Sequence, residues 1–254
     1  MVANHLVAFS TVVEGAAIVA GNPYGCGNLS RHADSCNTDQ PPISLQHLYA
    51  YTAARERAGL IDATANLKGK PLYLYSGVLD SIVSQGVMDR TQTYFNQYVG
   101  SAHVTYVDNM LSEHGYITDN YGECCSCLRG TFILNCQYDQ PGAIFRKIYG
   151  KQLKPKVQRA QADNLKTISQ KAYAPKDRPW SQCMLLEDAY VYVPTGCAGA
   201  KVAACRVHVN YHGCGGAGLT VPRHVGYNVW GEANDIVVVY PQASSGPGNP
   251  TGCW

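Results

Sequence analysis

An acid and a base stand just beyond two apolar stretches of the chain. The strand predicted over 70–76 leads to Asp80, and His114 follows 34 residues further on, after a second apolar run. A carboxylate beside an imidazole holds it in one tautomer and stabilises its protonated form, so the imidazole can act as a general base. Taken singly, Asp80 also fits a loop or helix-capping residue, and His114 fits an ordinary surface histidine.

A third feature is a glycine-rich turn. The strand predicted over 205–211 runs into His212-Gly213-Cys214-Gly215-Gly216. This turn resembles the oxyanion-hole turn of α/β-hydrolases, whose backbone N–H groups meet a developing oxyanion. In ordinary α/β-hydrolases that turn precedes the acid and base in the chain, whereas in this sequence it follows them. The order predicts a circularly permuted α/β-hydrolase, with a mostly parallel sheet and helices on both faces.

The chain contains no Gly-x-Ser-x-Gly motif that would supply a serine nucleophile. Residues 1–11 look like an amphipathic helix with no capping residue before it, and 16–20 look like a buried strand. An uncapped helix at residue 1 is what a chain cut just after a strand–nucleophile–helix turn would show. We therefore expect a truncated catalytic domain; the alternative is a normal N-terminus that lacks a cap.

Composition favours a single globular α/β domain over 1–254, incomplete at both ends. A mass of 27.5 kDa and 46% hydrophobic residues are enough for one large core. A net charge of +2 gives no reason to expect a nucleic-acid partner, and no apolar run is long enough to span a membrane. Residues 151–180 hold eight Lys or Arg against two Asp, which favours a solvated basic connector over a patch for an anionic partner.

Eleven cysteines predict disulfides and secretion. Local spacing suggests Cys26 with Cys36, Cys197 with Cys205, and pairing within the cluster 124–136. The alternative for that cluster is a metal site, but its spacing fits no familiar zinc pattern, so we expect no metal. The odd total leaves at least one cysteine free or paired outside the chain. A glycosylation sequon at 28–30 is compatible with secretion.

The remaining elements follow from apolar periodicity. The sequence predicts helices over 44–58, 86–99, 141–149 and 221–233, and further strands over 103–107, 189–193 and 235–240. The segment 111–119 is expected to be a loop that carries His114.

Several blocks, in order, resemble the catalytic domain of the polyhydroxybutyrate depolymerases, which are secreted polyester hydrolases. The matching blocks are 5–10, 19–26, 75–80, 114–122, 135–139, 190–194, 212–214, 226–230 and 249–254. They cover nearly the whole chain apart from 151–180. The family's lipase box would lie just before Met1, and its sequences continue past Trp254. The resemblance therefore implies a depolymerase domain without its nucleophile segment and extreme C-terminus.

The resemblance also implies roles. Asp80 would be the triad acid, His114 the base, the Cys214 N–H an oxyanion donor, and Trp254 part of the aromatic wall that holds the polymer. It further implies a disulfide between Cys214 and Cys253, while Cys124, Cys125, Cys127 and Cys183 have no assigned partners. The reaction would be serine ester hydrolysis of poly(3-hydroxybutyrate), without a cofactor and by a monomer. The alternatives are an inactive polymer-binding relative, or an esterase for short soluble or plant-wall esters.

Overall fold

The computed structural model describes residues 1–29, 34–150, 152–177, 179–199, 204–247 and 249–254. Ser30 of the sequon and the connector residues Lys151 and Arg178 lie outside the described residues. The chain divides into two compact units. Unit 1 comprises Met1–Tyr116, Glu123–Cys136 and Arg146–Lys151, and unit 2 comprises Ile117–Gly122, Gln137–Phe145 and Gln152–Trp254.

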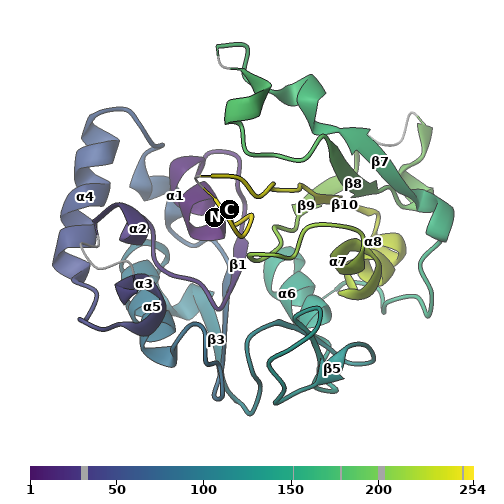
Figure 1. Ribbon diagram of the computed structural model, residues 1–254, viewed down its shortest axis with the longest axis horizontal. Coiled ribbons are helices and arrows are strands. Elements are labelled where there is room, and N and C mark those ends of the chain that lie inside the picture. The colour runs from purple at the N-terminus through teal and green to yellow at the C-terminus, as the bar shows by residue number, and fades with distance from the viewer. Residues whose placement is uncertain (30–33, 151, 178, 200–203, 248) are drawn as a thin grey trace. The chain divides into compact units, whose positions relative to one another are not determined.

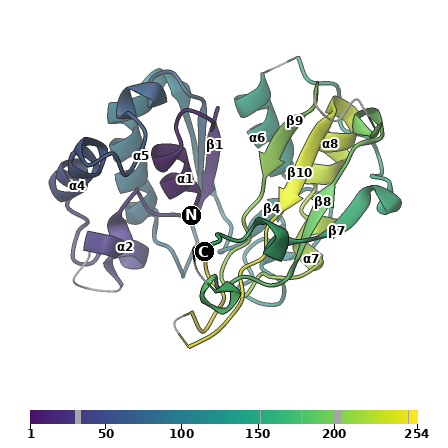
Figure 2. The same cartoon turned by 90° about the horizontal axis from the view of Figure 1, so that it is seen from above.

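Helices and strands are numbered in chain order and labelled in Figures 1 and 2 where space allows. The helices are α1 (Val2–Ala8), α2 (Cys26–Leu29), α3 (Ser35–Thr38), α4 (Leu45–Arg57), α5 (Gln85–Val99), α6 (Gln140–Tyr149), α7 (Thr220–His224) and α8 (Tyr227–Asn234). The strands are β1 (Ala16–Val19), β2 (Leu72–Gly77), β3 (Val104–Met110), β4 (Tyr116–Thr118), β5 (Glu123–Cys124), β6 (Ile133–Asn135), β7 (Leu165–Ser169), β8 (Asp188–Tyr192), β9 (Arg206–Val209) and β10 (Ile236–Tyr240). Short 3₁₀ helices cover Thr64–Leu67, Ser101–His103, Ala162–Asn164, Gln170–Tyr173, Trp180–Gln182 and Thr195–Cys197.

Unit 1 is built on a parallel sheet of three strands in the order β1-β2-β3. Every residue of the central strand β2 is buried, as expected for a strand covered on both faces. Helix α1 packs against β1, and α5 packs against β2 and β3. Because β2 and β3 are parallel, the loops that carry Asp80 and His114 leave the same edge of the sheet.

Helix α5 shows how the sequence determines the packing of unit 1. Val87, Met88, Phe95 and Val99 recur at helical spacing and are buried. The helix ends at Gly100, whose φ of +86° is readily available to glycine alone. This helix matches the one predicted over 86–99 to within one residue.

Unit 2 contains a mixed sheet in the order β7-β8-β10-β9 (Figure 2). Strands β9 and β10 are parallel, whereas β8 runs antiparallel to both β10 and β7. The prediction of a mostly parallel sheet therefore holds for unit 1 and, within this sheet, only for the β9–β10 pair. Helix α8 packs against β10.

Two sequence predictions are wrong in unit 2. The single helix predicted over 221–233 is two helices, because Gly226 adopts a φ of +90° between α7 and α8. The stretch 151–180, for which no strand was predicted, contains β7, which pairs with β8 from Leu165 to Ser169.

The close crossing of the chain at Gly77 gives a testable prediction. A Cβ atom at Gly77 would overlap the backbone carbonyl and the hydroxyl of Ser112. We expect Gly77→Ala to lower the free energy of unfolding by about 1–3 kcal/mol, because the backbone must move to relieve the overlap. Urea unfolding followed by far-UV circular dichroism measures the change.

Gly27→Ala is the matched control, because nothing lies within 4 Å of the added Cβ atom. If both variants unfold at the urea concentration of the wild type, the crossing at Gly77 is looser than described.

Candidate active site

Asp80 is fixed by its own loop beyond β2. Its Oδ1 accepts hydrogen bonds from the backbone N–H groups of Ile82 at 2.9 Å and Val83 at 2.7 Å. The side chain is 1% exposed. One carboxylate oxygen therefore caps the local turn, as the loop-capping interpretation of Asp80 predicted. The same carboxylate also faces His114.

His114 is hydrogen-bonded to Asp80 through Nδ1, which lies 2.9 Å from Oδ2 and 3.2 Å from Oδ1. An ionised carboxylate can only accept, so Nδ1 donates to it, and in the neutral imidazole Nε2 then presents a lone pair. The imidazole is 25% exposed, which leaves it accessible. This arrangement suits a general base whose tautomer is set by a buried acid.

The two loops are held together by backbone contacts to the segment 110–112. The N–H groups of Val78 and Leu79 donate to the carbonyls of Met110 (2.8 Å) and Ser112 (3.0 Å). The buried Tyr75 hydroxyl lies 2.7 Å from the Ser112 Oγ. These bonds fix the start of each loop before it reaches Asp80 or His114.

Phe132 is a neighbour of His114 that the sequence analysis did not assign. Its ring stands edge-on to the imidazole, with centroids 6.3 Å apart and planes at 82°. Its backbone has a φ of +54°, which is unusual for a bulky side chain. The side chain is 37% exposed. No spacing or motif in the sequence indicates this contact, which depends on the turn before β6.

In unit 2, the turn 212–216 is held by the buried His212. The Nδ1 of His212 lies 2.6 Å from the Gly213 carbonyl, so it donates, and Nε2 accepts from the Ala243 N–H at 3.0 Å. Both ring nitrogens are thus satisfied only in the neutral imidazole. Burial lowers the pKa of His212, and the bond to Gly213 offsets this in part.

The same turn is also tied to the last residues of the chain. Cys214 forms a disulfide with Cys253, and the Gly215 N–H donates to the Thr251 carbonyl at 2.6 Å. The Trp254 ring lies edge-on to Tyr211, with centroids 5.1 Å apart. Cys214 and Trp254 therefore share one local cluster, while Asp80 and His114 share another in unit 1.

All eleven cysteines lie in the described residues, and ten are paired. The disulfides join Cys26–Cys36, Cys124–Cys127, Cys125–Cys136, Cys197–Cys205 and Cys214–Cys253, while Cys183 is free. The cluster 124–136 thus forms two disulfides, the arrangement that the sequence left open. Bonds of this number are typical of proteins that fold in an oxidising compartment. No helix in the described ranges combines the length and apolarity that a membrane crossing needs.

Two known proteins are similar to this chain over nearly its whole length. The chain is 32% identical over 256 residues to a poly(3-hydroxybutyrate) depolymerase of Delftia acidovorans, covering 98% of this chain and 50% of the relative. It is 29% identical over 269 residues to a polyhydroxybutyrate depolymerase of Talaromyces funiculosus, covering 98% of this chain and 76% of that one. Both of these homologues are polyhydroxybutyrate depolymerases by name. No family model matches it.

Two solved structures of PHB depolymerases have a similar fold. The crystal structure of a PHB depolymerase from Penicillium funiculosum matches with a TM-score of 0.87 at 28% identity, covering 99% of this chain and 82% of that one. A serine-to-alanine variant of a PHB depolymerase, complexed with an R3HB trimer, matches with the same TM-score, identity and coverage. The chain spans half the length of its Delftia relative.

The basic segment contributes one charge, that of Lys156, to a network of ion pairs and hydrogen bonds. Lys156 Nζ pairs with Asp119 and, at 3.0 Å, with Asp139. Asp139 also accepts from the Trp230 indole N–H at 3.1 Å. Partial burial alone would lower the pKa of Lys156, but its bonds to both carboxylates raise it. The network gives Asp139 a structural role that the sequence had left unassigned.

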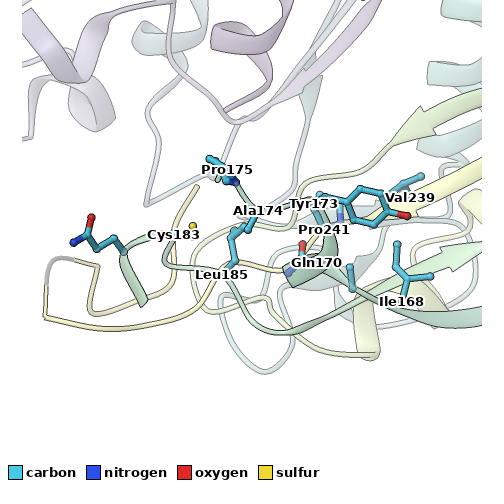
Figure 3. Close-up of a pocket in the computed structure, with 11 residues that line it drawn as sticks. Ile168, Gln170, Tyr173, Ala174, Pro175, Cys183, Leu185, Val239 and Pro241 are labelled. Carbon is cyan, nitrogen blue, oxygen red and sulfur yellow. The ribbon is translucent and has the colours of Figure 1, made fainter. Parts of the chain in front are cut away.

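A separate apolar pocket of about 360 Å³ lies in unit 2 around the free Cys183 (Figure 3). It is lined by Ile168, Gln170, Tyr173, Ala174, Pro175, Gln182, Cys183, Leu185, Ala189, Val239 and Pro241. None of the site residues predicted from the sequence lines it. The Gln170 side chain is already bonded to the Leu186 and Gln242 carbonyls.

The neutral His212 predicts a pH dependence of unit 2. Its pKa is lowered in the fold, so below pH ~6.5 the unfolded chain binds a proton that the folded chain does not. Stability therefore falls as pH falls, by up to about 1.4 kcal/mol per pH unit, until His212 protonates in the fold. Trp180, Trp230 and Trp254 all lie in unit 2, so tryptophan fluorescence during urea unfolding measures this unit.

His212→Asn is the comparison variant, since an amide offers a donor and an acceptor but does not titrate. We expect it to lose less stability than the wild type between pH 7.5 and pH 5. An equal loss in both proteins would assign the pH dependence to other groups.

Proposed function

We propose that this chain carries the acid, the base and an oxyanion donor of a serine hydrolase that cleaves ester bonds in poly(3-hydroxyalkanoate) polyesters. The observation that carries the proposal is the 2.9 Å hydrogen bond between His114 Nδ1 and the buried Asp80. The names of the relatives support the polyester substrate, and the R3HB trimer bound in a structurally similar depolymerase supports recognition of short oligomers.

The proposed reaction begins at His114 Nε2. This atom takes the proton of a serine hydroxyl as the hydroxyl oxygen attacks the ester carbonyl. Asp80 holds the imidazole tautomer and stabilises the imidazolium, and the Cys214 N–H donates to the tetrahedral oxyanion. The imidazolium then protonates the departing alkoxide. Water, deprotonated by the same imidazole, attacks the acyl-enzyme and releases the 3-hydroxyacid.

The chain does not contain the motif that usually supplies the serine nucleophile. Since no Gly-x-Ser-x-Gly occurs in the 254 residues, we propose that the nucleophile comes from sequence outside them and that the chain alone is inactive. The chain order of Asp80, His114 and then the turn 212–216 supports the circular permutation of an α/β-hydrolase.

Apolar side chains around the acid–base pair support an apolar polymer over a soluble ester. Val78, Leu79 and Ile82 flank Asp80 in the chain, and each is more than 40% exposed. Phe132 adds an exposed ring beside His114. We assign Trp254 to the substrate wall through its place beside the turn 212–216. The five disulfides support a secreted enzyme, and we propose that it acts as a monomer.

The test requires the reading frame upstream of the Met1 codon, expressed together with this chain. We expect the product to release 3-hydroxybutyrate from an R3HB trimer. Asp80→Asn and His114→Ala should each lower kcat about a thousandfold or more, because triad residues act as a unit. Product release measured by liquid chromatography gives the rates, and the exposed Asp163→Asn is the matched control.

Three outcomes would contradict the proposal. Hydrolysis that survives Asp80→Asn and His114→Ala would remove these residues from the mechanism. Cleavage of short soluble esters without cleavage of the trimer or polymer would indicate an esterase of the same fold. A reading frame closed directly upstream of Met1 would leave an inactive relative.

A further inference from the structure

We propose that Glu113 is a positioning residue that sets the distance between Asp80 and His114. The inference deepens the proposed function and rests on it. One carboxylate oxygen, Oε2, accepts three hydrogen bonds: from the Ser81 N–H at 3.1 Å, the Ser81 hydroxyl at 3.2 Å and the His114 N–H at 2.9 Å. Glu113 therefore bonds to a residue beside the acid and to the backbone of the base.

The Asp80 side of this connection is stiff. Asp80 is bonded within its own turn to the N–H groups of Ile82 and Val83, and Ser81 lies inside that turn. A shift of the Ser81 backbone therefore also shifts the carboxylate of Asp80. By bonding Ser81 through both backbone and side chain, Glu113 holds the acid loop at two points.

Without Glu113, fewer hydrogen bonds would hold His114 in place. The imidazole meets Asp80 through Nδ1 alone, and a quarter of the side chain is exposed. The backbone N–H of His114 is bonded to Glu113, so the peptide plane before the histidine Cα is fixed by the same oxygen that holds Ser81. The starting point of the imidazole is thereby tied to the acid loop.

Glu113 is itself anchored from a third segment. Its backbone N–H donates to the Cys125 carbonyl at 2.9 Å, and Cys125 is joined to Cys136 by a disulfide. The side chain thus reaches from an immobilised backbone toward the Asp80 loop. This geometry differs from that of a surface carboxylate such as Glu14, which is 86% exposed and makes one long ion pair to Lys70 at 3.9 Å.

A carboxylate suits the task because three donors converge on one atom. Hydrogen bonds to an ionised oxygen are shorter and stronger than those to a neutral one. A glutamine at 113 keeps one acceptor oxygen of similar reach, so it should retain much of the geometry. An alanine leaves the Ser81 and His114 donors to water.

Proton NMR of the chain as it stands tests the proposal without any catalytic activity. An imidazole N–H bonded to a carboxylate gives a signal far downfield of the amides, and Asp80→Asn identifies it by removing it. We expect Glu113→Ala to speed exchange of this proton with water on the order of tenfold or to abolish the signal. Glu113→Gln should restore most of the protection, and Glu14→Ala should leave it unchanged.

The outcomes separate this proposal from the function it rests on. A Glu113→Ala protein that keeps the wild-type signal and exchange rate overturns the positioning role alone. A wild-type chain without any signal sensitive to Asp80→Asn overturns the acid–base pair itself. If circular dichroism shows Glu113→Ala to be unfolded, Ser81→Ala decides: faster exchange supports the role of Glu113, and an unchanged rate overturns it.

Discussion

The acid–base pair depends on how closely the chain crosses itself at Gly77 and Ser112. Parallel pairing of β2 and β3 brings both loops to one edge of the sheet, but it does not fix their separation. The crossing fixes where the two loops start, because the missing side chain of Gly77 lets the backbone of the Asp80 loop lie against the Ser112 carbonyl. The hydrogen bonds from Val78 and Leu79 then continue that contact toward the functional residues.

The turn 212–216 is restrained by different chemistry. Unit 1 uses backbone crossing and a charged oxygen, whereas the turn in unit 2 uses a neutral imidazole and a disulfide. His212 bridges the turn to Ala243, and Cys214 bridges it to Cys253, so two segments after β10 hold it.

The sequence predicts what depends on local pattern. Apolar runs predicted β2 and β10, which the structure contains. The position of Asp80 and His114 after strands predicted a pair, and the structure brings the two within hydrogen-bond distance. Strand β7 was not predicted because only two of its residues, Leu165 and Ile168, are apolar and it lies within a basic stretch. The strand is stabilised by pairing with β8. The role of Glu113 escaped for a related reason, since its partner Ser81 lies 32 residues away and no motif joins them.

Selection for stability and selection for activity would act on Phe132 in opposite directions. A left-handed conformation costs a non-glycine residue about 1 kcal/mol or more, and glycine would adopt it freely. The ring, however, is what stands beside His114. Directed evolution for heat tolerance alone would favour glycine at this position. If the proposed polyester hydrolysis uses the ring beside His114, selection on turnover would keep Phe132 and accept the less stable turn.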